Sequence, residues 1–297
     1  MRHSIRRAAA AAPCGNIVQV MTRFDNTVSA TPDRYGVVGH PVAHSLSPLI
    51  HSAFADATRQ SMTYDRYDVA PENFERDVSA FFERGGRGLN VTVPHKGRAA
   101  AWANELTPRA QRAGAVNTLI KLEDGRILGD NTDGAGLMSD LSRLGVEVTG
   151  RRLLILGAGG ATRGILGPLQ ERHPAEIVIA NRTAERARAL VGNQGCRYDE
   201  LGPFLNRGEF DLVIHATPLG LSGGIPAVDP RVIGTRTFAY DLGYGKPDTP
   251  FMRWARQHGA AGVAQGLGML VEQAAESFRI WRGIAPDTTE VHRNIAA

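Results

Sequence analysis

The sequence predicts an α/β fold with two domains, a mixed α/β domain followed by a domain built on a parallel sheet. The length of 297 residues is the first observation, because single hydrophobic cores rarely grow beyond about 250–300 residues. The second is a regular alternation of short apolar runs with segments of helical periodicity, which is typical of parallel sheets. The third is a glycine-rich turn directly after one apolar run, at Gly157.

Composition and charge are those of an ordinary globular protein. The hydrophobic fraction of 42% and the charged fraction of 22% are typical, and no apolar run approaches the ~18 residues that a membrane span needs. The net charge of +4 comes from scattered arginines without interleaved aromatic residues, which disfavours a nucleic-acid binder. The two cysteines, Cys14 and Cys196, cannot build a disulfide framework, so a reducing, cytoplasmic compartment is expected.

The first residues differ from the rest. Met1–Pro13 holds three arginines and a run of five alanines, and the first acidic residue is Asp25. A mitochondrial or plastid transit peptide shares this composition. We favour a disordered N-terminal extension over residues 1–34, or a start codon assigned upstream of a true initiator at Met21.

The first domain is expected to open with alternating strands and helices. Tyr35–Gly39 predicts a strand. Ser47 followed by Pro48 is typical of a helix start, with the serine as the cap. A second strand is expected over Tyr64–Val69. The next helix is predicted from four apolar residues that precede a Gly85-Gly86 stop: Phe74, Val78, Phe81 and Phe82.

The stretch Asn90–Lys96 is the most informative in this half of the chain. It predicts a short buried strand in which Val91 and Val93 alternate with polar residues until Pro94 ends it. Lys96 then follows just past the carboxyl end of the strand. Ligands bind at that end of open α/β sheets, so Lys96 is a candidate functional residue.

A hairpin and a connecting helix are expected to complete this domain. Asp124-Gly125 between two apolar runs, 119–122 and 126–128, is a strong hairpin signal. The carboxylate-rich turn Gly129–Gly134 follows and brings Asp133 toward the same edge as Lys96. Residues 134–144 have the pattern of a helix that leads into the second domain.

The second domain is predicted to be Rossmann-like. Its expected strands are Arg152–Leu156, Glu176–Ala180, Asp211–His215 and Thr237–Asp241. A long helix from about Leu267 to Arg282 is expected to return to the first domain. We therefore expect residues 35–134 plus 264–297 to form the first domain and residues 135–263 the second.

The turn at Gly157 predicts a dinucleotide site. Strand and helix flank the sequence Gly157-Ala158-Gly159-Gly160-Ala161, whose glycines allow close approach of a pyrophosphate to the helix amino end. Its spacing departs from a strict G-x-G-x-x-G pattern, but the context is that of a nucleotide-binding turn.

The residues after the second strand indicate NADP as the cofactor. NAD enzymes usually carry an acidic residue there, which accepts a hydrogen bond from the ribose 2′-hydroxyl. This sequence has Asn181-Arg182-Thr183 and then Arg186, so a 2′-phosphate would be attracted rather than repelled. The alternative is that both arginines only face solvent at a helix start, although two cations at that end oppose the helix dipole.

Lys96 and Asp133 suit a hydride-transfer enzyme. Reduction of a ketone needs a hydride on carbon and a proton on oxygen. A lysine can supply that proton when burial lowers its pKa and a nearby carboxylate holds it in place. Taken singly, each residue has a more ordinary explanation, a solvated lysine or a turn aspartate, but their combination favours catalysis.

Other polar residues are candidate substrate ligands. Ser45 and Ser47 place hydroxyl groups at a helix amino end, where a carboxylate is favoured. Thr92 and Asn117 interrupt apolar runs, as ligands of substrate hydroxyl groups do. Four histidines, His40, His44, His51 and His95, match no common zinc spacing, so no metal is expected.

From about Tyr35 to its carboxyl end, the sequence resembles the shikimate dehydrogenase family. The resemblance rests on ordered motifs: Gly39–Pro48, Asn90–Lys96, Ala113–Thr118, Gly129–Gly134, the Gly157 loop, Asn181–Thr183 and Gly266–Leu270. It implies NADPH-dependent reduction of 3-dehydroshikimate to shikimate, in the route to chorismate and the aromatic amino acids. A homodimer is a further possibility.

The resemblance also assigns roles. It implies that Lys96 and Asp133 are the catalytic pair. The substrate carboxylate would be held by Ser45 and Ser47 with help from Tyr244. The ring hydroxyls would be bound by Thr92, Asn117 and Gln273. The cofactor would contact Gly157, Ala158, Gly159, Gly160, Ala161, Asn181, Arg182, Thr183 and Arg186, with Thr217, Leu242 and Gly266 along its nicotinamide.

Three departures from the family pattern are visible. His40 replaces the asparagine of a common Gly-Asn-Pro, and His215 stands where an asparagine commonly precedes Ala-Thr. Pro108 falls where an acidic residue sometimes contacts the cofactor, so that contact is not expected here. Residues 1–34 have no counterpart in the family.

Three rival functions are weighed against this one. An NAD-using quinate/shikimate dehydrogenase is disfavoured by Arg182 and Thr183. A nucleotide-sensing module without catalysis is disfavoured by the presence of both Lys96 and Asp133. A nucleic-acid binder is disfavoured by the dispersed charge.

Overall fold

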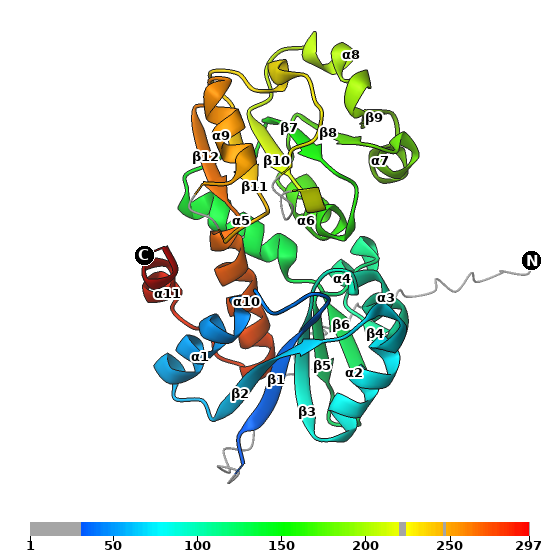
Figure 1. Cartoon of the computed structure of the whole chain (residues 1–297), viewed down its shortest axis with the longest axis vertical. Helices are drawn as coiled ribbons and strands as arrows, with labels where there is room; N and C mark the ends of the chain where they lie inside the picture. Colours follow the sequence, from blue (N-terminus) through cyan, green and yellow to red (C-terminus); the bar gives the residue numbers. More distant parts are fainter. Residues whose placement is uncertain (1–30, 220–223, 246–247, 297) are drawn as a thin grey trace, which may run out of the picture.

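The computed structural model describes residues 31–219, 224–245 and 248–296. The extension expected over residues 1–34 lies outside this part of the chain except for its last four residues. Two of those, Asp33 and Arg34, already belong to the first strand. Two sheets occupy opposite ends of the molecule, joined by helices in the middle (Figure 1). The predicted two-sheet α/β fold is confirmed.

The first sheet is mixed and has the order β2-β1-β3-β5-β6-β4. The strand β1 pairs in parallel with β2 and β3, whereas β3 pairs antiparallel with β5, and β5 with β6. Its strands are β1 (Asp33–Gly39), β2 (Met62–Asp68), β3 (Gly86–Val91), β4 (Glu105–Leu106), β5 (Thr118–Lys121) and β6 (Ile127–Asp130). The predicted hairpin is therefore the β5–β6 pair.

Helices cover both faces of this sheet. One face packs against three of them, through a core that includes Phe74, Val78 and Leu89. They are α2 (Phe74–Glu83), α3 (Lys96–Trp102) and α4 (Pro108–Ala113). The other face is covered by α1 (Ser47–Thr58) and by α10 (Leu267–Arg282), which returns from the far end of the chain. Trp281 of α10 donates its indole N–H to the Leu119 carbonyl at 3.1 Å, which anchors that helix on the sheet.

The second sheet is entirely parallel and has the order β12-β11-β10-β7-β8-β9. Its strands are β7 (Arg152–Leu156), β8 (Glu176–Asn181), β9 (Gly195–Arg197), β10 (Leu212–His215), β11 (Phe238–Asp241) and β12 (Gly262–Gln265). Successive residues of β7 alternate between two cores, Leu153 and Ile155 on one face and Leu154 and Leu156 on the other. Burial on both faces explains why these strands are continuous apolar runs.

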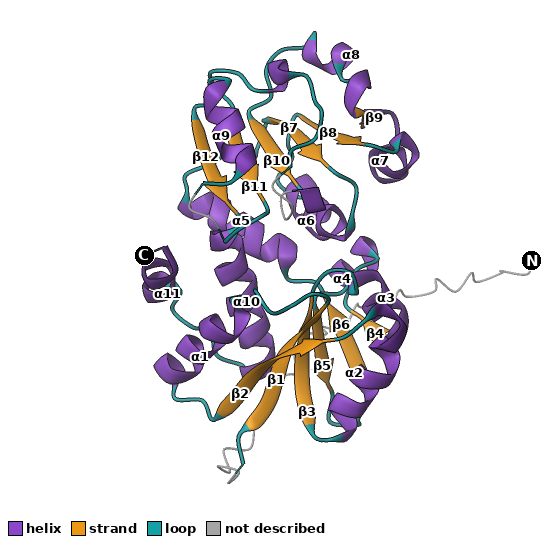
Figure 2. Cartoon of the chain, in the orientation of Figure 1, coloured by secondary structure: helices purple, strands orange, loops and turns teal. Residues whose placement is uncertain are grey.

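Helices sandwich the second sheet (Figure 2). The face with Leu153 packs against residues of α5 (Asp133–Arg143), α6 (Gly160–Gln170) and α7 (Ala184–Val191). The opposite face packs against α8 (Gly202–Leu205) and α9 (Pro250–Gln257). A short helix, α11 (Thr289–Ala296), ends the described chain.

Two helices connect the sheets. The helix α5 leaves the first sheet, and α10 packs along it before reaching α1. Gly136 of α5 allows this approach, because a Cβ there would lie 2.7 Å from the Gln273 backbone nitrogen. A further contact joins α4 to α6, where Arg112 and Glu171 form an ion pair at 2.8 Å.

Some elements differ from the sequence-based prediction. The strand expected to include Val93 ends at Val91, and the Val93 side chain is 52% exposed. Gly86 begins β3 rather than ending the preceding helix, which stops at Glu83. Several short elements were not predicted, namely the strands β4, β9 and β12 and the helices α3, α4, α8, α9 and α11. These elements are two to eight residues long, too short for a periodic pattern to distinguish them from loops.

Candidate active site

Lys96 and Asp133 meet between the two sheets. Lys96 is the first residue of α3, reached by a short turn after β3, and Asp133 is the first residue of α5, reached after β6. The Lys96 Nζ donates to Asp133 Oδ2 at 2.5 Å across a separation of 37 residues. Their side chains are 17% and 6% exposed, so the ion pair is largely shielded from solvent.

Asn117 fixes the second oxygen of the same carboxylate. It immediately precedes β5 and is buried. Its Nδ2 lies 2.9 Å from Asp133 Oδ1 and 3.2 Å from Gln273 Oε1, while its Oδ1 accepts from the Thr132 backbone N–H at 2.8 Å. These bonds join the end of the first sheet to α5 and α10. Asp133 therefore has little freedom to rotate away from Lys96.

Gln273 reaches this cluster from the returning helix α10. Its Nε2 donates to the Leu270 carbonyl at 2.9 Å, so its oxygen is turned toward Asn117. Thr132 Oγ1 contacts the Gln273 carbonyl at 3.1 Å. Thus Lys96, Asp133, Asn117 and Gln273 lie together, although their order in the chain places them far apart.

Asn90, Thr118 and Ser277 form a buried polar layer beneath these residues. Sequence reasoning did not single out any of the three as site residues. Asn90 Nδ2 lies 3.0 Å from Ser277 Oγ and 3.2 Å from Thr118 Oγ1. Tyr64 donates its hydroxyl to Asn90 Oδ1 at 2.7 Å. A polar residue in the apolar strand ahead of Val91 was a signal for Asn90, whereas nothing in the helical pattern of α10 marks Ser277.

Ser45 and Ser47 lie at the start of α1, and both are buried. The prediction that Ser47 caps this helix is wrong, because the cap position is Leu46 and no side chain caps the helix. Instead, Ser45 Oγ accepts the Ser47 backbone N–H at 3.3 Å. The Ser47 hydroxyl therefore does not cap the helix, and the Ser47 backbone N–H is satisfied by Ser45.

Tyr64 lies close to Ser47, and Tyr244 lies close to Tyr64. Burial raises the pKa of the Tyr64 phenol well above its ordinary value, a hydrogen bond with Ser47 lowers it, and the nearby Tyr244 phenol raises it. Tyr244 follows β11, and burial raises its pKa as well. Both phenols therefore remain protonated, and Tyr64 gives its proton to Asn90. Thr92 lies in the turn after β3, where its backbone N–H donates to the Val38 carbonyl at 2.9 Å.

The glycine turn after β7 and the helix α6 that follows it face Lys96 and Asp133. A Cβ at Gly160 would lie 3.7 Å from Lys96 Cβ, and a Cβ at Gly164 would lie 3.0 Å from Asp133 Oδ2. Gly157 has a φ of +114°, and a Cβ there would come within 2.9 Å of the Ala216 carbonyl oxygen. Gly159 occupies the cap position of α6, and no side chain caps the helix. The backbone N–H groups of this turn, which includes Ala158 and Ala161, are suited to an anionic group.

Arg182 and Arg186 are exposed at the start of α7. Among the described residues, neither guanidinium forms an ion pair, whereas Arg188 on the same helix pairs with Glu200 at 3.2 Å. Asn181 Nδ2 donates to the Thr183 carbonyl at 2.9 Å, which shapes the turn between β8 and the helix. Two unneutralised cations thus lie beside the glycine turn.

Thr217, Leu242 and Gly266 follow β10, β11 and β12 at one edge of the parallel sheet. The Leu242 N–H donates to the His215 carbonyl at 2.9 Å, and the Gly266 N–H donates to the Gly243 carbonyl at 3.1 Å. All three lie just past the carboxyl ends of strands, and Thr217 lies next to Gly157. This is the edge at which open parallel sheets bind their ligands.

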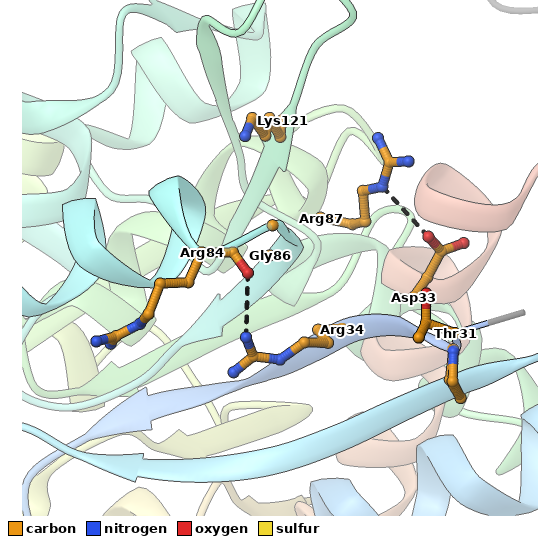
Figure 3. A pocket seen from close by; sticks show the side chains of 9 residues that line it. Thr31, Asp33, Arg34, Arg84, Gly86, Arg87 and Lys121 are labelled. Atoms are coloured by element: carbon orange, nitrogen blue, oxygen red, sulfur yellow. Dashed lines mark hydrogen bonds and ion pairs between the residues drawn. The ribbon is translucent and has the colours of Figure 1, made fainter. Parts of the chain in front are cut away.

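A separate pocket of about 410 Å³ lies at the other end of the first sheet (Figure 3). It opens where β1 and β3 begin, whereas Lys96 lies beyond the end of β3. Three of its cations already have partners: Arg34 with the Arg84 carbonyl at 3.2 Å, Arg87 with Asp33 at 3.2 Å and Lys121 with the Phe82 carbonyl at 2.8 Å. It contains none of the predicted site residues. In the described part of the chain, no helix is both long and apolar enough to cross a lipid bilayer.

Comparison with known proteins gives a consistent picture. Residues 37–119 match the family model of the shikimate dehydrogenase substrate binding domain. Residues 140–219 match shikimate / quinate 5-dehydrogenase, and residues 266–293 match the shikimate 5′-dehydrogenase C-terminal domain.

Individual proteins match over most of the chain. The NADP(+) shikimate dehydrogenase of Aeromonas salmonicida is 50% identical over 270 residues, covering 89% of this chain and 97% of the relative. That of Alkalilimnicola ehrlichii is 51% identical over 263 residues, covering 87% and 97%. The solved shikimate 5-dehydrogenase of Thermus thermophilus, in complex with NADP(H) and shikimate, is 35% identical with a TM-score of 0.79, covering 89% and 100%.

Proposed function

The chain belongs to the shikimate dehydrogenase family, and from this premise we propose that it catalyses the reversible NADPH-dependent reduction of 3-dehydroshikimate to shikimate. The observation that carries the proposal is the shielded Lys96–Asp133 ion pair, which faces the glycine turn of the second domain. This reaction serves the biosynthesis of chorismate and the aromatic amino acids.

The catalytic roles follow from the donors and acceptors at the site. Bound NADPH supplies the hydride that adds to the carbonyl carbon. The Lys96 ammonium gives its proton to the carbonyl oxygen, and in the reverse direction its amine takes a proton from the hydroxyl group. Asp133 holds Lys96 at 2.5 Å and, with its other oxygen tied to Asn117, keeps the nitrogen aimed at one place. Positioned proton transfer of this kind is typically worth about 10²–10⁴ in rate.

The substrate fits the polar groups around the pair. Its carboxylate is assigned to the hydroxyls of Ser45 and Ser47, with Tyr244 as a third donor. Tyr244 remains protonated, since burial raises its pKa. The ring hydroxyls are assigned to Thr92, Asn117 and Gln273. The hydrogen bond between Asn117 and Gln273 fixes the orientation of both amide groups. The proposed substrate ligands thus come from the ends of the first sheet, the start of α1, the helix α10 and, with Tyr244, the segment after β11.

The second domain fits NADP(H). Gly157 and Gly160 leave room for a pyrophosphate against the backbone, and the uncapped amino end of α6 supplies N–H donors. Arg182 and Arg186 supply positive charge where a 2′-phosphate is placed, with Asn181 and Thr183 shaping the turn. An acidic residue there would repel that phosphate, and this distinguishes the site from the NAD pattern.

The remaining expectations are proposals of the same kind. We assign substrate binding to residues 35–134 with 264–297, and cofactor binding to residues 135–263. The anchoring of α10 on the first sheet by Trp281 supports the discontinuous substrate domain. The low cysteine content supports a cytoplasmic location. We also propose a homodimer, which light scattering of the purified protein tests.

Purified protein tests the function directly through the absorbance of NADPH during reduction of 3-dehydroshikimate. We expect turnover with NADPH, much weaker turnover with NADH, and a loss of turnover in Lys96→Ala with retained binding of NADPH. A Lys96→Ala enzyme as active as the unmodified one would support the nucleotide-sensing module instead. Efficient oxidation of quinate with NAD would support the quinate/shikimate dehydrogenase branch.

A further inference from the structure

A buried chain of side chains runs from β11 to the cofactor edge of the second sheet. His215 ends β10 and is fully buried, and Asp241 ends the neighbouring strand β11 with 1% of its side chain exposed. The His215 Nδ1 lies 3.0 Å from Asp241 Oδ1, and the His215 Nε2 lies 2.6 Å from Thr217 Oγ1. The imidazole therefore bridges Asp241 to Thr217.

The partners of the ring determine which nitrogen carries the proton. Asp241 Oδ1 also accepts the Gly243 backbone N–H at 3.0 Å, so this oxygen is an acceptor. The His215 Nδ1 is therefore assigned as the donor, and in that tautomer Nε2 bears a lone pair. Thr217 gives its hydroxyl proton to that lone pair. The Thr217 oxygen is left with its own lone pairs, and toward any other group it acts as an acceptor.

Thr217 itself lies just past the carboxyl end of β10. The methyl group of Thr217 packs against the glycine turn, since a Cβ at Gly157 would lie 3.1 Å from Thr217 Cγ2. The methyl group of Thr217 thus contacts Gly157, and its hydroxyl proton is used by His215. Thr217 is half-buried and follows β10 directly, between the turn at Gly157 and Leu242. Thr217 therefore lies at the edge at which the proposed function places the nicotinamide, and His215 does not use its oxygen lone pairs.

We propose that Asp241 and His215 are positioning residues that make Thr217 an obligate acceptor for the carboxamide N–H of the nicotinamide. This inference rests on the proposed function, which supplies the cofactor, and concerns only the hydrogen bond to the carboxamide group of that cofactor. Asparagine commonly occupies position 215 in the family. An asparagine amide reaches the place of Nδ1 and can hold Asp241, but it is too short to hold Thr217 as well. The relay to Thr217 is therefore a property of the histidine in this chain.

Cofactor analogues separate this acceptor from simple packing. The 3-acetylpyridine analogue of NADP+ carries a methyl group in place of the carboxamide nitrogen, whereas the thionicotinamide analogue keeps both N–H bonds. We expect Thr217→Val to raise the KM for NADP+ and for the thionicotinamide analogue about 2–10-fold, the effect of one neutral hydrogen bond. The KM for the acetylpyridine analogue should stay unchanged. Thr217→Ser keeps the hydroxyl group, so its KM values for NADP+ and for both analogues should match those of the unmodified enzyme.

His215→Asn tests the relay itself. It preserves the contact with Asp241 and so the fold, which thermal unfolding verifies, but it releases the Thr217 hydroxyl. We expect His215→Asn to reduce the difference in KM between NADP+ and the acetylpyridine analogue. The double variant Thr217→Val/His215→Asn should have nearly the same KM for NADP+ as Thr217→Val alone. Fully additive effects would overturn the relay, because two residues that act through one hydrogen bond cannot contribute independently.

Two further outcomes would overturn the proposal. Equal rises in KM for NADP+ and the acetylpyridine analogue in Thr217→Val would show that Thr217 acts by packing. Equal losses in Thr217→Val and Thr217→Ser would show that the hydroxyl group has no role. The proposed function is tested apart from this, by turnover of the unmodified enzyme with NADP+ and shikimate. If the enzyme lacks turnover, the same comparison is made with dissociation constants for the two oxidised cofactors.

Discussion

Replacing Gly164 by alanine is expected to slow the reaction by displacing Asp133 from Lys96. Gly164 lies on α6, where its missing side chain allows the helix to pack against the turn that holds Asn131 and Asp133. An added Cβ would lie 2.9 Å from Asn131 Oδ1 and 3.0 Å from Asp133 Oδ2. Asn131 cannot yield freely, because its Nδ2 donates to the Ala115 carbonyl at 2.9 Å and its Oδ1 accepts the Asp133 N–H at 3.1 Å.

The magnitude follows from these separations. Restoring ordinary contact distances of roughly 3.5 Å requires a shift of about 0.5 Å in the carboxylate or in α6. A misplacement of about 1 Å can cost ~10² in rate, so we expect kcat to fall about 10-fold. The KM for NADPH should change little if the turn moves rather than the helix. Overpacking of this kind typically costs about 1–3 kcal/mol of stability, partly offset by the ~1 kcal/mol helix preference of alanine over glycine.

Steady-state kinetics and thermal unfolding together measure this effect. Gly167→Ala is the matched control, because it adds the same methyl group to the same helix at a position with nothing within 4 Å. We expect the control to keep the kcat of the unmodified enzyme. A Gly164→Ala enzyme with undiminished kcat would refute the inferred coupling between α6 and the catalytic carboxylate.

Three more predictions concern the catalytic pair, the cofactor and stability. Asp133→Asn should lower kcat by about 10²–10⁴, because an amide nitrogen can face Lys96 where the carboxylate oxygen was; retention of kcat would contradict the catalytic role. Arg182→Asp should reduce the preference for NADPH over NADH by about 10–150-fold, the contribution of one charge-assisted hydrogen bond. The control Arg188→Ala should leave the preference unchanged. An unchanged preference in Arg182→Asp would contradict the assignment of Arg182 to the 2′-phosphate. Burial lowers the pKa of His51 from 6.5 to about 3, so the unfolded state binds more protons between these values and the free energy of unfolding should rise with pH across that window and level off above it. Denaturant titrations over a pH series should show this slope, at most about 1.4 kcal/mol per pH unit, reduced in His51→Gln; equal slopes in both proteins would exclude His51 as its source.

The sequence alone determined most of the elements that position the site. The apolar runs of β7, β8, β10 and β11 predicted a parallel sheet because burial on both faces leaves no polar alternation. The helical period of α10 was long enough to place it at Leu267–Arg282, as observed. Lys96 and Asp133 were recognisable because each is a charged residue directly after an apolar strand or in a conspicuous turn. Local patterns of this kind need no knowledge of the fold.

Tertiary structure decided which distant groups touch. The bond between Asn117 and Gln273 spans 156 residues, and the one between Asn90 and Ser277 spans 187. No period or motif relates such pairs, because they meet only after α10 has returned to the first sheet. The same holds for Gly164, whose missing side chain has meaning only against Asp133. Helix and strand formation depend on neighbours along the chain, whereas hydrogen bonds in a buried site depend on packing between elements, and that packing emerges only in the folded protein.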